Sequence, residues 1–438
     1  MKRLFIILTP LITITMTGLS QTDTTRVAAQ SQGIAFEHGL SWQEVLQKAQ
    51  RENKYVFVDC YATWCGPCKR MDKNVYPIDS VGSFMNDRYI SVKMQMDSTR
   101  QDNDEIRQWY AVARTFEGKY HIGAYPTFLF FSTDGQVLHK DIGGKNINDF
   151  LSMAMAALDP KQQYYTLLAD YRSGKMTFAL MPVLANAARR NGQDSLASQV
   201  SRYYMHHYLE TLPEGEMWTR DNILFVYRYS SFVNITDNIF QQYYRNRMTI
   251  DSVMHDGDFS DALINEVLYR DEIEPQINKS LAATADEPRW HHLERRMTEN
   301  YDALYAQKNI LQGQINYYKA KKNWKQYIKY FIRQQEMNGI ESWLGPAKSF
   351  DLNNGAYEVF KYDDNKRDLE KALSWVNRAL VGADALDPQT MDTKANLLYK
   401  LGKKSEGLAL EEKSHTLSPR DKDIAASYEK MKNGLPTW

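Results

Sequence analysis

The sequence is poor in cysteine, balanced in charge and, beyond its first twenty residues, without a long apolar run. Three cysteines in 438 residues are an odd number, which allows at most one disulfide within the chain and excludes a fold that is stabilised by several disulfides. The 54 basic and 54 acidic residues give a formal net charge of zero, so the basic excess of a nucleic-acid-binding surface is missing and no nucleic-acid partner is expected. No later segment has the length and apolarity of a membrane span.

The length and the aromatic content point to a well-packed protein of several parts. A chain of 438 residues is too long for one ordinary hydrophobic core, which predicts two or three domains. Tyrosine is unusually frequent at 28 residues, with 17 Phe and 9 Trp. Amphipathic aromatic side chains fill the seams between packed elements, so extensive disorder is not expected.

The first twenty residues have the features of a secretory signal peptide. Two basic residues precede an apolar run from Leu4 to Leu19 that is broken by Pro10. A transmembrane anchor is the alternative, but this stretch is short and rich in threonine. A bacterial lipoprotein would have a cysteine at the cleavage site, whereas the first cysteine here is Cys60. We therefore expect residues 1–20 to be removed and the mature chain to be soluble in a periplasm, with no lipid anchor.

An α/β pattern begins after a polar lead. Residues 21–35 are small and polar, and they predict a flexible segment. Ser41 is followed three positions later by Glu44, the spacing of a capping box, and apolar residues then recur at helical spacing. A helix is therefore expected to start after Ser41.

Strands and helices alternate up to residue 158. "KYVFVDCYA" (54–62) is a β-rich apolar run that predicts a buried strand, and residues 87–97 predict a second. Residues 125–144 read as two strands joined by a hairpin turn at Asp134-Gly135, with a helix after them. This order predicts an α/β domain over residues 36–158, a small mixed sheet covered by helices.

The strand signals largely stop at residue 159. From there the chain reads as paired amphipathic helices, an α-helical region over 159–345 and helical repeats over 346–438. The last stretch is similar to a tetratricopeptide repeat, although its prolines at 388 and 419 are closer together than the usual period of about 34 residues. A non-repeating helical bundle is the alternative.

Two of the three cysteines form a Cys-X-X-Cys motif, "DCYATWCGPCKR", at Cys65 and Cys68. A structural zinc site needs four ligands, so Cys65 and Cys68 would need two more. Cys60 is the one other cysteine in the sequence, and the histidines show no spacing that would supply a second ligand pair, so no metal is expected. A disulfide between Cys65 and Cys68 closes too small a loop to stabilise the fold much. A redox couple is therefore the favoured interpretation.

The spacing of the motif suits thiol-disulfide exchange. The Gly66-Pro67 pair predicts a helix start, because proline is tolerated in the first turn. Cys65 would then lie at a helix N-terminus, where free N–H groups and the helix dipole stabilise a thiolate and lower its pKa. Cys68, one turn further on, is placed to attack a mixed disulfide and release a reduced substrate.

Three segments carry a resemblance to a known family, the thioredoxins. "FVDCYATWCGPCKRM" resembles the thioredoxin active site, including Trp64 and an aspartate, Asp59, six positions before the first cysteine. "SVKMQMD" resembles the next family strand and contains Lys93, and "YHIGAYPTFLFF" resembles the family's cis-proline segment at Pro126. These motifs occur in the family's order within residues 36–158. Among relatives, this segment most resembles the secreted thioredoxin-like domains of periplasmic reductant relays.

The resemblance implies roles for these residues. Asp59 would be a buried carboxylate that assists proton transfer at Cys68, and Lys93 would pair with Asp59. A cis bond before Pro126 would let Tyr125 offer its backbone to an incoming peptide strand. The implied substrate-binding residues are Trp64, Gly66, Pro67, Tyr125 and Pro126.

The chain also departs from the family pattern near the expected substrate groove. The segment between Asp97 and Pro126 is longer than compact thioredoxins need and predicts an extended helix, and Tyr125 is bulkier than usual. Cys60 should point to the opposite sheet face from Asp59. It is interpreted as a small buried hydrophobe, with a third redox thiol as the alternative.

The sequence therefore predicts an extracytoplasmic thiol-disulfide oxidoreductase. The Gly-Pro spacer is that of strongly reducing thioredoxins, whose reduction potential is about −270 mV, and it favours a protein disulfide reductase. The expected partners are client proteins with disulfides or oxidised thiols, a membrane electron donor, and a peptide or protein ligand of the helical repeats. No cofactor is expected beyond the Cys65/Cys68 disulfide. The alternative is a helical-repeat scaffold in which the thioredoxin-like part is a docking module.

Overall fold

The computed structural model describes residues 33–282, 286–337 and 346–438. The chain divides into two compact units, Met1–Ala197 and Ser198–Trp438, and each is described by itself. The expected signal peptide, residues 1–20, lies outside the described residues. Residues 33–35, the described end of the expected flexible lead, are attached to the first unit, because Ile34 N–H donates to the Tyr76 carbonyl at 2.9 Å.

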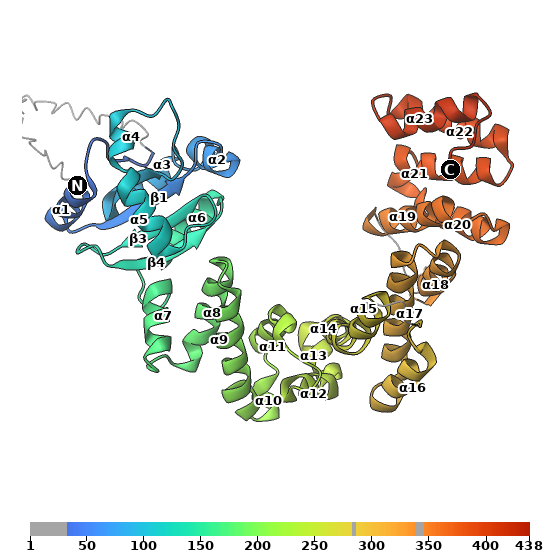
Figure 1. The fold of residues 1–438 in the computed structure, drawn as a ribbon, viewed down its shortest axis with the longest axis horizontal. Coiled ribbons are helices and arrows are strands. Elements are labelled where there is room, and N and C mark those ends of the chain that lie inside the picture. The colour runs from blue at the N-terminus through green and yellow to red at the C-terminus, as the bar shows by residue number, and fades with distance from the viewer. Residues whose placement is uncertain (1–32, 283–285, 338–345) are drawn as a thin grey trace, which may run out of the picture. The chain divides into compact units, whose positions relative to one another are not determined.

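The first unit contains a mixed sheet with strand order β2-β1-β3-β4, of which Figure 1 labels β1, β3 and β4. Strand β1 pairs in parallel with β2, and antiparallel with β3, which pairs antiparallel with β4. The strands are β1 (Tyr55–Tyr61), β2 (Tyr89–Gln95), β3 (Thr127–Phe131) and β4 (Val137–Ile142). The α/β fold class and the mixed sheet predicted from the sequence are confirmed.

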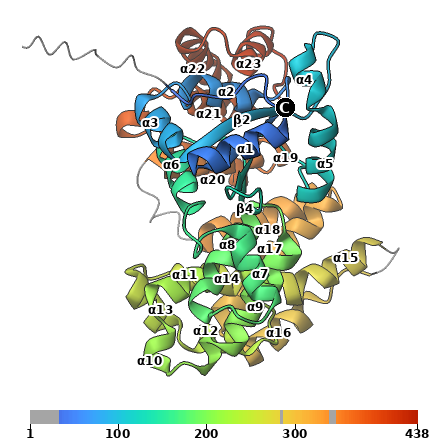
Figure 2. The same cartoon turned by 90° about the vertical axis from the view of Figure 1, so that its left-hand side faces the viewer.

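Helices cover both faces of this sheet. In the first unit they are α1 (Trp42–Glu52), α2 (Gly66–Asn74), α3 (Asp79–Arg88), α4 (Asp104–Gln108), α5 (Tyr110–Tyr120), α6 (Ile147–Ala156), α7 (Tyr164–Arg172) and α8 (Met181–Arg190). Side chains of α1 and α5 pack on one face of the sheet and those of α2, α3 and α6 on the other. Figure 2 looks onto the face that α1 crosses. Successive β1 residues alternate between these two cores, as the two-residue period of a strand requires.

Local signals set the ends of several elements. Ser41 caps α1, and a reciprocal bond from Ser41 N–H to Glu44 completes the predicted capping box at 2.7 Å. Gly135 sits in the turn between β3 and β4 with φ of +84°, a conformation that glycine adopts without strain.

The long segment between β2 and β3 differs from the expected single extended helix. It forms a loop followed by two helices, α4 and α5, which meet at Trp109. The loop is held by the buried carboxylate of Asp102, which accepts hydrogen bonds from Thr99 N–H, from the Gln95 amide and from the Tyr110 hydroxyl. These bonds are made between residues on separate elements, so helical periodicity did not reveal them.

Helices α7 and α8 continue the first unit beyond residue 158 and cover the edge strand β4. The N–H of Tyr164, at the start of α7, donates to Nδ1 of His139 at 3.0 Å. The side-chain amide of Asn191, just after α8, donates to the Lys140 carbonyl at 3.0 Å. The helical pair therefore covers β4 and pairs one of its edge carbonyls, that of Lys140.

The rest of the described chain is helical, as expected. The helices are α9 (Asp194–His207), α10 (Glu214–Met217), α11 (Arg220–Arg228), α12 (Asn238–Arg245), α13 (Arg247–Met254), α14 (Phe259–Leu268), α15 (Glu274–Ala282), α16 (Trp290–Asn300), α17 (Ala303–Ala320), α18 (Trp324–Met337), α19 (Pro346–Tyr362), α20 (Lys366–Ala379), α21 (Pro388–Lys400), α22 (Lys404–Leu417) and α23 (Lys422–Lys432). A π-helix, Tyr269–Ile273, follows α14. Sequential helices pack as pairs, such as α17 with α18 and α21 with α22.

The pair α21–α22 crosses closely. A Cβ atom added to Gly407 would lie 2.8 Å from the Ala395 carbonyl oxygen, so the small residue is required at this crossing. Gly402 forms the turn between the helices with φ of +87°. The fold here is a set of packed helix pairs, and its tetratricopeptide nature stays a prediction.

Within the described residues, no helix reaches the length and apolarity that crossing a bilayer would require.

Candidate active site

The predicted helix start at the cysteine motif is present. Helix α2 begins at Gly66, with Pro67 in its first turn and Cys65 as the N-cap residue. The Cys65 sulfur accepts a hydrogen bond from Cys68 N–H at 3.1 Å. In the reduced state, the same N–H and the helix dipole would stabilise a Cys65 thiolate.

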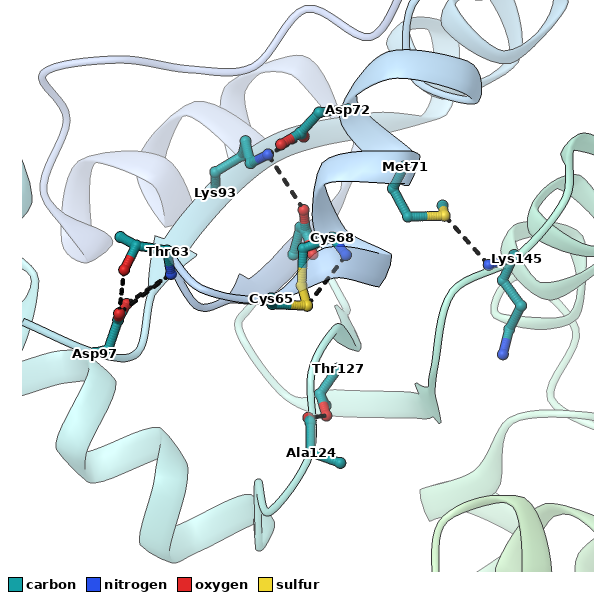
Figure 3. Close-up of a disulfide and its surroundings, with 11 residues drawn as sticks. Thr63, Cys65, Cys68, Met71, Asp72, Lys93, Asp97, Ala124, Thr127 and Lys145 are labelled. Atoms are coloured by element: carbon teal, nitrogen blue, oxygen red, sulfur yellow. Dashed lines mark hydrogen bonds and ion pairs between the residues drawn. A yellow bond between two sulfur atoms is a disulfide. The ribbon is translucent and has the colours of Figure 1, made fainter. Parts of the chain in front are cut away.

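The two sulfurs of the motif are bonded to each other. Cys65 and Cys68 form a disulfide with their Cα atoms 5.3 Å apart (Figure 3). Each residue is only 2% exposed, so the oxidised pair is almost sealed from solvent. Attack by an external thiol therefore requires side chains above the pair to move.

Two aromatic residues lie at the mouth of this site. Tyr125 packs against the cluster that contains both cysteines. Its ring meets the Trp64 ring edge-on, with centroids 5.8 Å apart, while Trp64 itself is 70% exposed. The Tyr125–Pro126 peptide bond is cis, as the family resemblance implied. An exposed indole beside a tyrosine cover offers an apolar surface to an incoming polypeptide.

Asp59 is a buried carboxyl group on β1. It is 1% exposed, and its oxygens make no hydrogen bond of normal geometry among the described residues, although the Tyr76 hydroxyl and the Lys93 ammonium both interact with it and lower its pKa. Burial raises the pKa of Asp59 to about 6, although the nearby Lys93 ammonium acts in the opposite direction. A carboxyl group with this pKa exchanges a proton readily near neutral pH.

Lys93 is shared between two carboxylates. It lies opposite Asp59 in the β1–β2 register, and its Nζ is 3.6 Å from Asp59 Oδ2. The same Nζ makes a closer hydrogen bond and ion pair with Asp72 of α2 (Figure 3). The sequence analysis missed Asp72, although its position four residues after Cys68 places it one helical turn further along α2.

A second missed interaction holds the segment before the cysteines. Thr63 N–H donates to Asp97 Oδ1 at 3.0 Å, and the Thr63 hydroxyl donates to Asp97 Oδ2 (Figure 3). Thr63 follows β1 and Asp97 follows β2, so the parallel pairing of the two strands brings them together. This contact fixes the backbone immediately before Trp64.

Cys60 lies apart from the redox pair. It is fully buried in the core beneath α1 and α5, on the opposite face of the sheet from the α2 core. Burial raises the pKa of the Cys60 thiol well above its ordinary value, which keeps it protonated. This placement agrees with a small buried hydrophobe and gives no support to a third redox thiol.

The fold and the cysteine pair define a thioredoxin-like domain, and comparison with known proteins agrees. The family model of a thioredoxin-like domain matches residues 42–157. The chain is 30% identical over 116 residues to thioredoxin H1 of Arabidopsis thaliana, which covers 26% of this chain and 85% of that protein. The chain therefore belongs to the thioredoxin family through this domain.

Two other matches each cover less than a third of this chain. The thiol:disulfide interchange protein DsbD of Pseudoalteromonas atlantica is 31% identical over 120 residues, 27% of this chain and 18% of that protein. The solution structure of a disulphide-isomerase candidate from Bacteroides thetaiotaomicron is 34% identical, with 30% of this chain and 98% of that one covered and a TM-score of 0.25. The chain thus spans less than two thirds of some curated relatives, DsbD among them.

Proposed function

We propose that this protein is a thiol-disulfide oxidoreductase that reduces disulfides in client proteins in an extracytoplasmic compartment. The observation that carries the proposal is the Cys65 sulfur at the N-terminus of α2, which accepts the Cys68 N–H while bonded to its partner sulfur. Asp59, a buried carboxyl group with a pKa raised to about 6, is the proton acceptor that we assign to the pair.

The reaction is a two-step exchange. The Cys65 thiolate of the reduced protein attacks one sulfur of the client disulfide, forming a mixed disulfide and releasing the other client sulfur as a thiolate. Cys68 then loses its proton to Asp59 and attacks the Cys65 sulfur, which breaks the mixed disulfide. The client leaves with two reduced sulfurs, and the protein keeps the Cys65–Cys68 disulfide.

The direction proposed is reduction, with a membrane electron donor returning the two electrons. The Gly66-Pro67 spacer supports it, because this spacer occurs in strongly reducing members of the fold and no histidine stands inside the motif. Location in the periplasm rests on the signal-like residues 1–20. A potential measured well above that of glutaredoxins would reverse the proposed direction and leave the exchange chemistry in place.

Insulin reduction by dithiothreitol tests the activity. The wild-type chain should accelerate it, Cys65→Ser should abolish the acceleration, and Cys60→Ser should keep it, because Cys60 lies in a separate core. Trapping then names the clients: Cys68→Ser leaves the mixed disulfide at Cys65 unresolved, and mass spectrometry identifies what is attached.

A second candidate function is a helical scaffold with the thioredoxin-like domain as a docking module. The observation that favours it is the near-complete burial of both cysteines beneath Tyr125. In that case the wild-type chain would show no insulin reduction, and a peptide or protein would bind the helical region regardless of the state of Cys65.

A further inference from the structure

Positive charge is concentrated in the helical hairpin α17–α18 of the second unit. Between Asp302 and Glu336 the sequence has no acidic residue. The same stretch contains seven basic residues, Lys308, Lys319, Lys321, Lys322, Lys325, Lys329 and Arg333. The two helices pack against each other (Figure 1). Because the whole chain has a formal net charge of zero, this excess of positive charge is local to the hairpin.

Ion pairs within the protein neutralise two of the seven cations. Lys308 Nζ lies 2.7 Å from Asp261 Oδ2, and Lys319 Nζ lies 3.9 Å from Glu358 Oε2. The other five are exposed and make no ion pair with any residue that the structure describes. We call these five residues the basic stripe: Lys321, Lys322, Lys325, Lys329 and Arg333.

Neighbouring groups leave the charge of the basic stripe in place. Glu336, the first acidic residue after it, lies 2.6 Å from Lys371 on α20 and is paired there. The ammonium groups of Lys321 and Lys329 lie 6.0 and 5.2 Å from the centroids of nearby tyrosine rings. Such a cation–π contact holds a side chain without cancelling its charge. The stripe therefore keeps five positive charges at the protein surface.

Three residues of the basic stripe form a line along α18. Lys325, Lys329 and Arg333 are four positions apart, so successive helical turns place them on one face over about 12 Å. The residues that α18 buries, Tyr327 and Ile328 among them, lie on another face. Like charges one turn apart repel each other and lie within the screening length of physiological salt. This arrangement lowers stability unless an anionic partner covers it.

The type of cation favours a lipid surface over a protein partner. Four of the five residues of the stripe are lysines. Lysine is a strongly hydrated point charge on a flexible stem and is depleted at protein–protein interfaces, where the planar fork of arginine is preferred. An anionic membrane attracts cations through a diffuse surface potential that requires no fixed geometry. Clusters of about four to eight basic residues on an amphipathic helix are typical of binding to anionic lipids.

The aromatic side chains beside the stripe are held by the protein. The Trp324 ring stacks on the Tyr362 ring with centroids 4.2 Å apart, and the Tyr330 ring stacks on the Tyr318 ring at 5.5 Å. Trp324 and Tyr330 are both half-buried. The contact with a membrane is therefore expected at the level of the headgroups, without insertion of these rings.

We infer that the basic stripe binds the surface of a membrane that contains anionic phospholipids. The inference goes beyond the proposed function and does not depend on the cysteine chemistry. Binding of this kind would hold the chain beside the membrane that contains the proposed electron donor. Because the attraction is between exposed charges, the binding is reversible and is weakened by salt.

Vesicle sedimentation with the full chain tests the inference. The wild-type chain should bind vesicles of mixed phosphatidylglycerol and phosphatidylcholine and be released by high salt. The triple variant Lys325→Gln, Lys329→Gln, Arg333→Gln should bind them about 100-fold more weakly, about fivefold for each lost cation. Residues 1–20 are the same in every variant, so vesicles of phosphatidylcholine alone measure any binding that this apolar segment causes.

A second triple variant, Lys413→Gln, Arg420→Gln, Lys422→Gln, is the matched control. It also removes two lysines and one arginine, all exposed, from a stretch that contains acidic residues such as Glu412 and Asp421. It should bind anionic vesicles like the wild type. Both variants should keep the wild-type melting temperature, because exposed positions without an ion pair contribute little to stability.

Three outcomes would overturn the lipid site. The first is equal binding of the two triple variants to anionic vesicles, and the second is equal binding of the wild type to neutral and anionic vesicles. The third is binding of the wild type to polyglutamate and not to anionic vesicles, which would assign the stripe to an acidic polypeptide. Glycerol phosphate should not displace the vesicles at equal ionic strength; displacement would assign the stripe to a free phosphate and refute the lipid site.

Insulin reduction separates this inference from the proposed function. The stripe lies in the second unit, whereas both cysteines of the motif lie in the first. The variant that lacks the three cations of α18 should therefore reduce insulin in solution as fast as the wild type. Loss of lipid binding with normal insulin reduction, and the reverse, are distinguishable results.

Discussion

Replacing Asp72 with asparagine should change the acidity of Asp59 without touching either cysteine. Lys93 Nζ lies between the two carboxylates, 3.6 Å from Asp59 Oδ2 and closer still to Asp72. The Asp72 charge raises the pKa of Asp59, and Asp72 also holds the ammonium that would lower it. Asp72→Asn removes both effects, so Asp59 should become more acidic.

The size of the change follows from the spacing. Two carboxylates on opposite sides of one ammonium are about 6 Å apart, and at an effective dielectric constant between about 20 and 40 their repulsion is about 1.5 to 3 kcal/mol. Because Asp72 is partly exposed, the lower end applies. That corresponds to a fall of about one unit in the pKa of Asp59.

The assay follows the second release of thionitrobenzoate when the reduced chain reacts with Ellman's reagent. The first release reports attack by Cys65, and the second reports attack by Cys68 on the mixed disulfide. If Asp59 accepts the Cys68 proton, the acid limb of the second rate should move to lower pH by about one unit in Asp72→Asn. Lys93→Gln should move it to higher pH, because Lys93 lowers the pKa of Asp59.

Asp87→Asn is the matched control, since Asp87 is exposed on α3 and pairs with Arg88. It should leave the limb in place. An unchanged limb in Asp72→Asn, or a move to higher pH, would refute the account of Lys93 as a shared cation.

Three further outcomes follow from the same structure. Burial raises the pKa of Asp59 from 3.8 to about 6, so the protonated carboxyl group contributes fully to stability below about pH 4, and this contribution is lost as the pH rises through 6. The free energy of unfolding of Asp59→Asn in urea should therefore exceed that of the wild type by about 3 kcal/mol at pH 8 and equal it at pH 4. In the second unit, burial and Asp392 raise the pKa of Glu411 to about 9, so the wild-type melting temperature should fall between pH 7 and 10, and Glu411→Gln should remove that fall. Tyr125→Ala should uncover the disulfide, and its reduction by dithiothreitol, followed by alkylation and mass spectrometry, should be several-fold faster than in the wild type; equal rates would show that Tyr125 is not the cover.

The parts of the fold that the sequence predicted are those set by neighbouring residues. The apolar strand runs, the Ser41 capping box, the Asp134-Gly135 turn and the helix start at Gly66 all depend on contacts within a few positions. The cysteine pair and its place at a helix N-terminus could be predicted for the same reason. These signals are enough to order the strands and helices of a thioredoxin-like domain.

The rest of the site depends on which distant segments meet. The pairing of Lys93 with Asp59 could be predicted through the family resemblance. Its second ion pair, with Asp72, forms only because α2 packs against β2. The Thr63–Asp97 contact requires two strands to end side by side. The loop before α4 and α5 is held by Asp102, which accepts hydrogen bonds from Gln95 on β2, Thr99 in the loop and Tyr110 on α5.

Strand β4 shows what a local sequence pattern does not reveal about the surroundings of a strand. Its sequence "VLHKDI" has three consecutive polar residues, which is typical of a solvated edge, yet His139, Lys140 and Asp141 are all buried. The Lys140 ammonium donates to the carbonyls of Tyr120 and His121 at the end of α5, and the other two meet α7 and α8. Burying such groups is tolerated only when partners are supplied, and here several partners come from residues after 158. The helical pair α7–α8 is thus part of what makes this edge of the sheet stable.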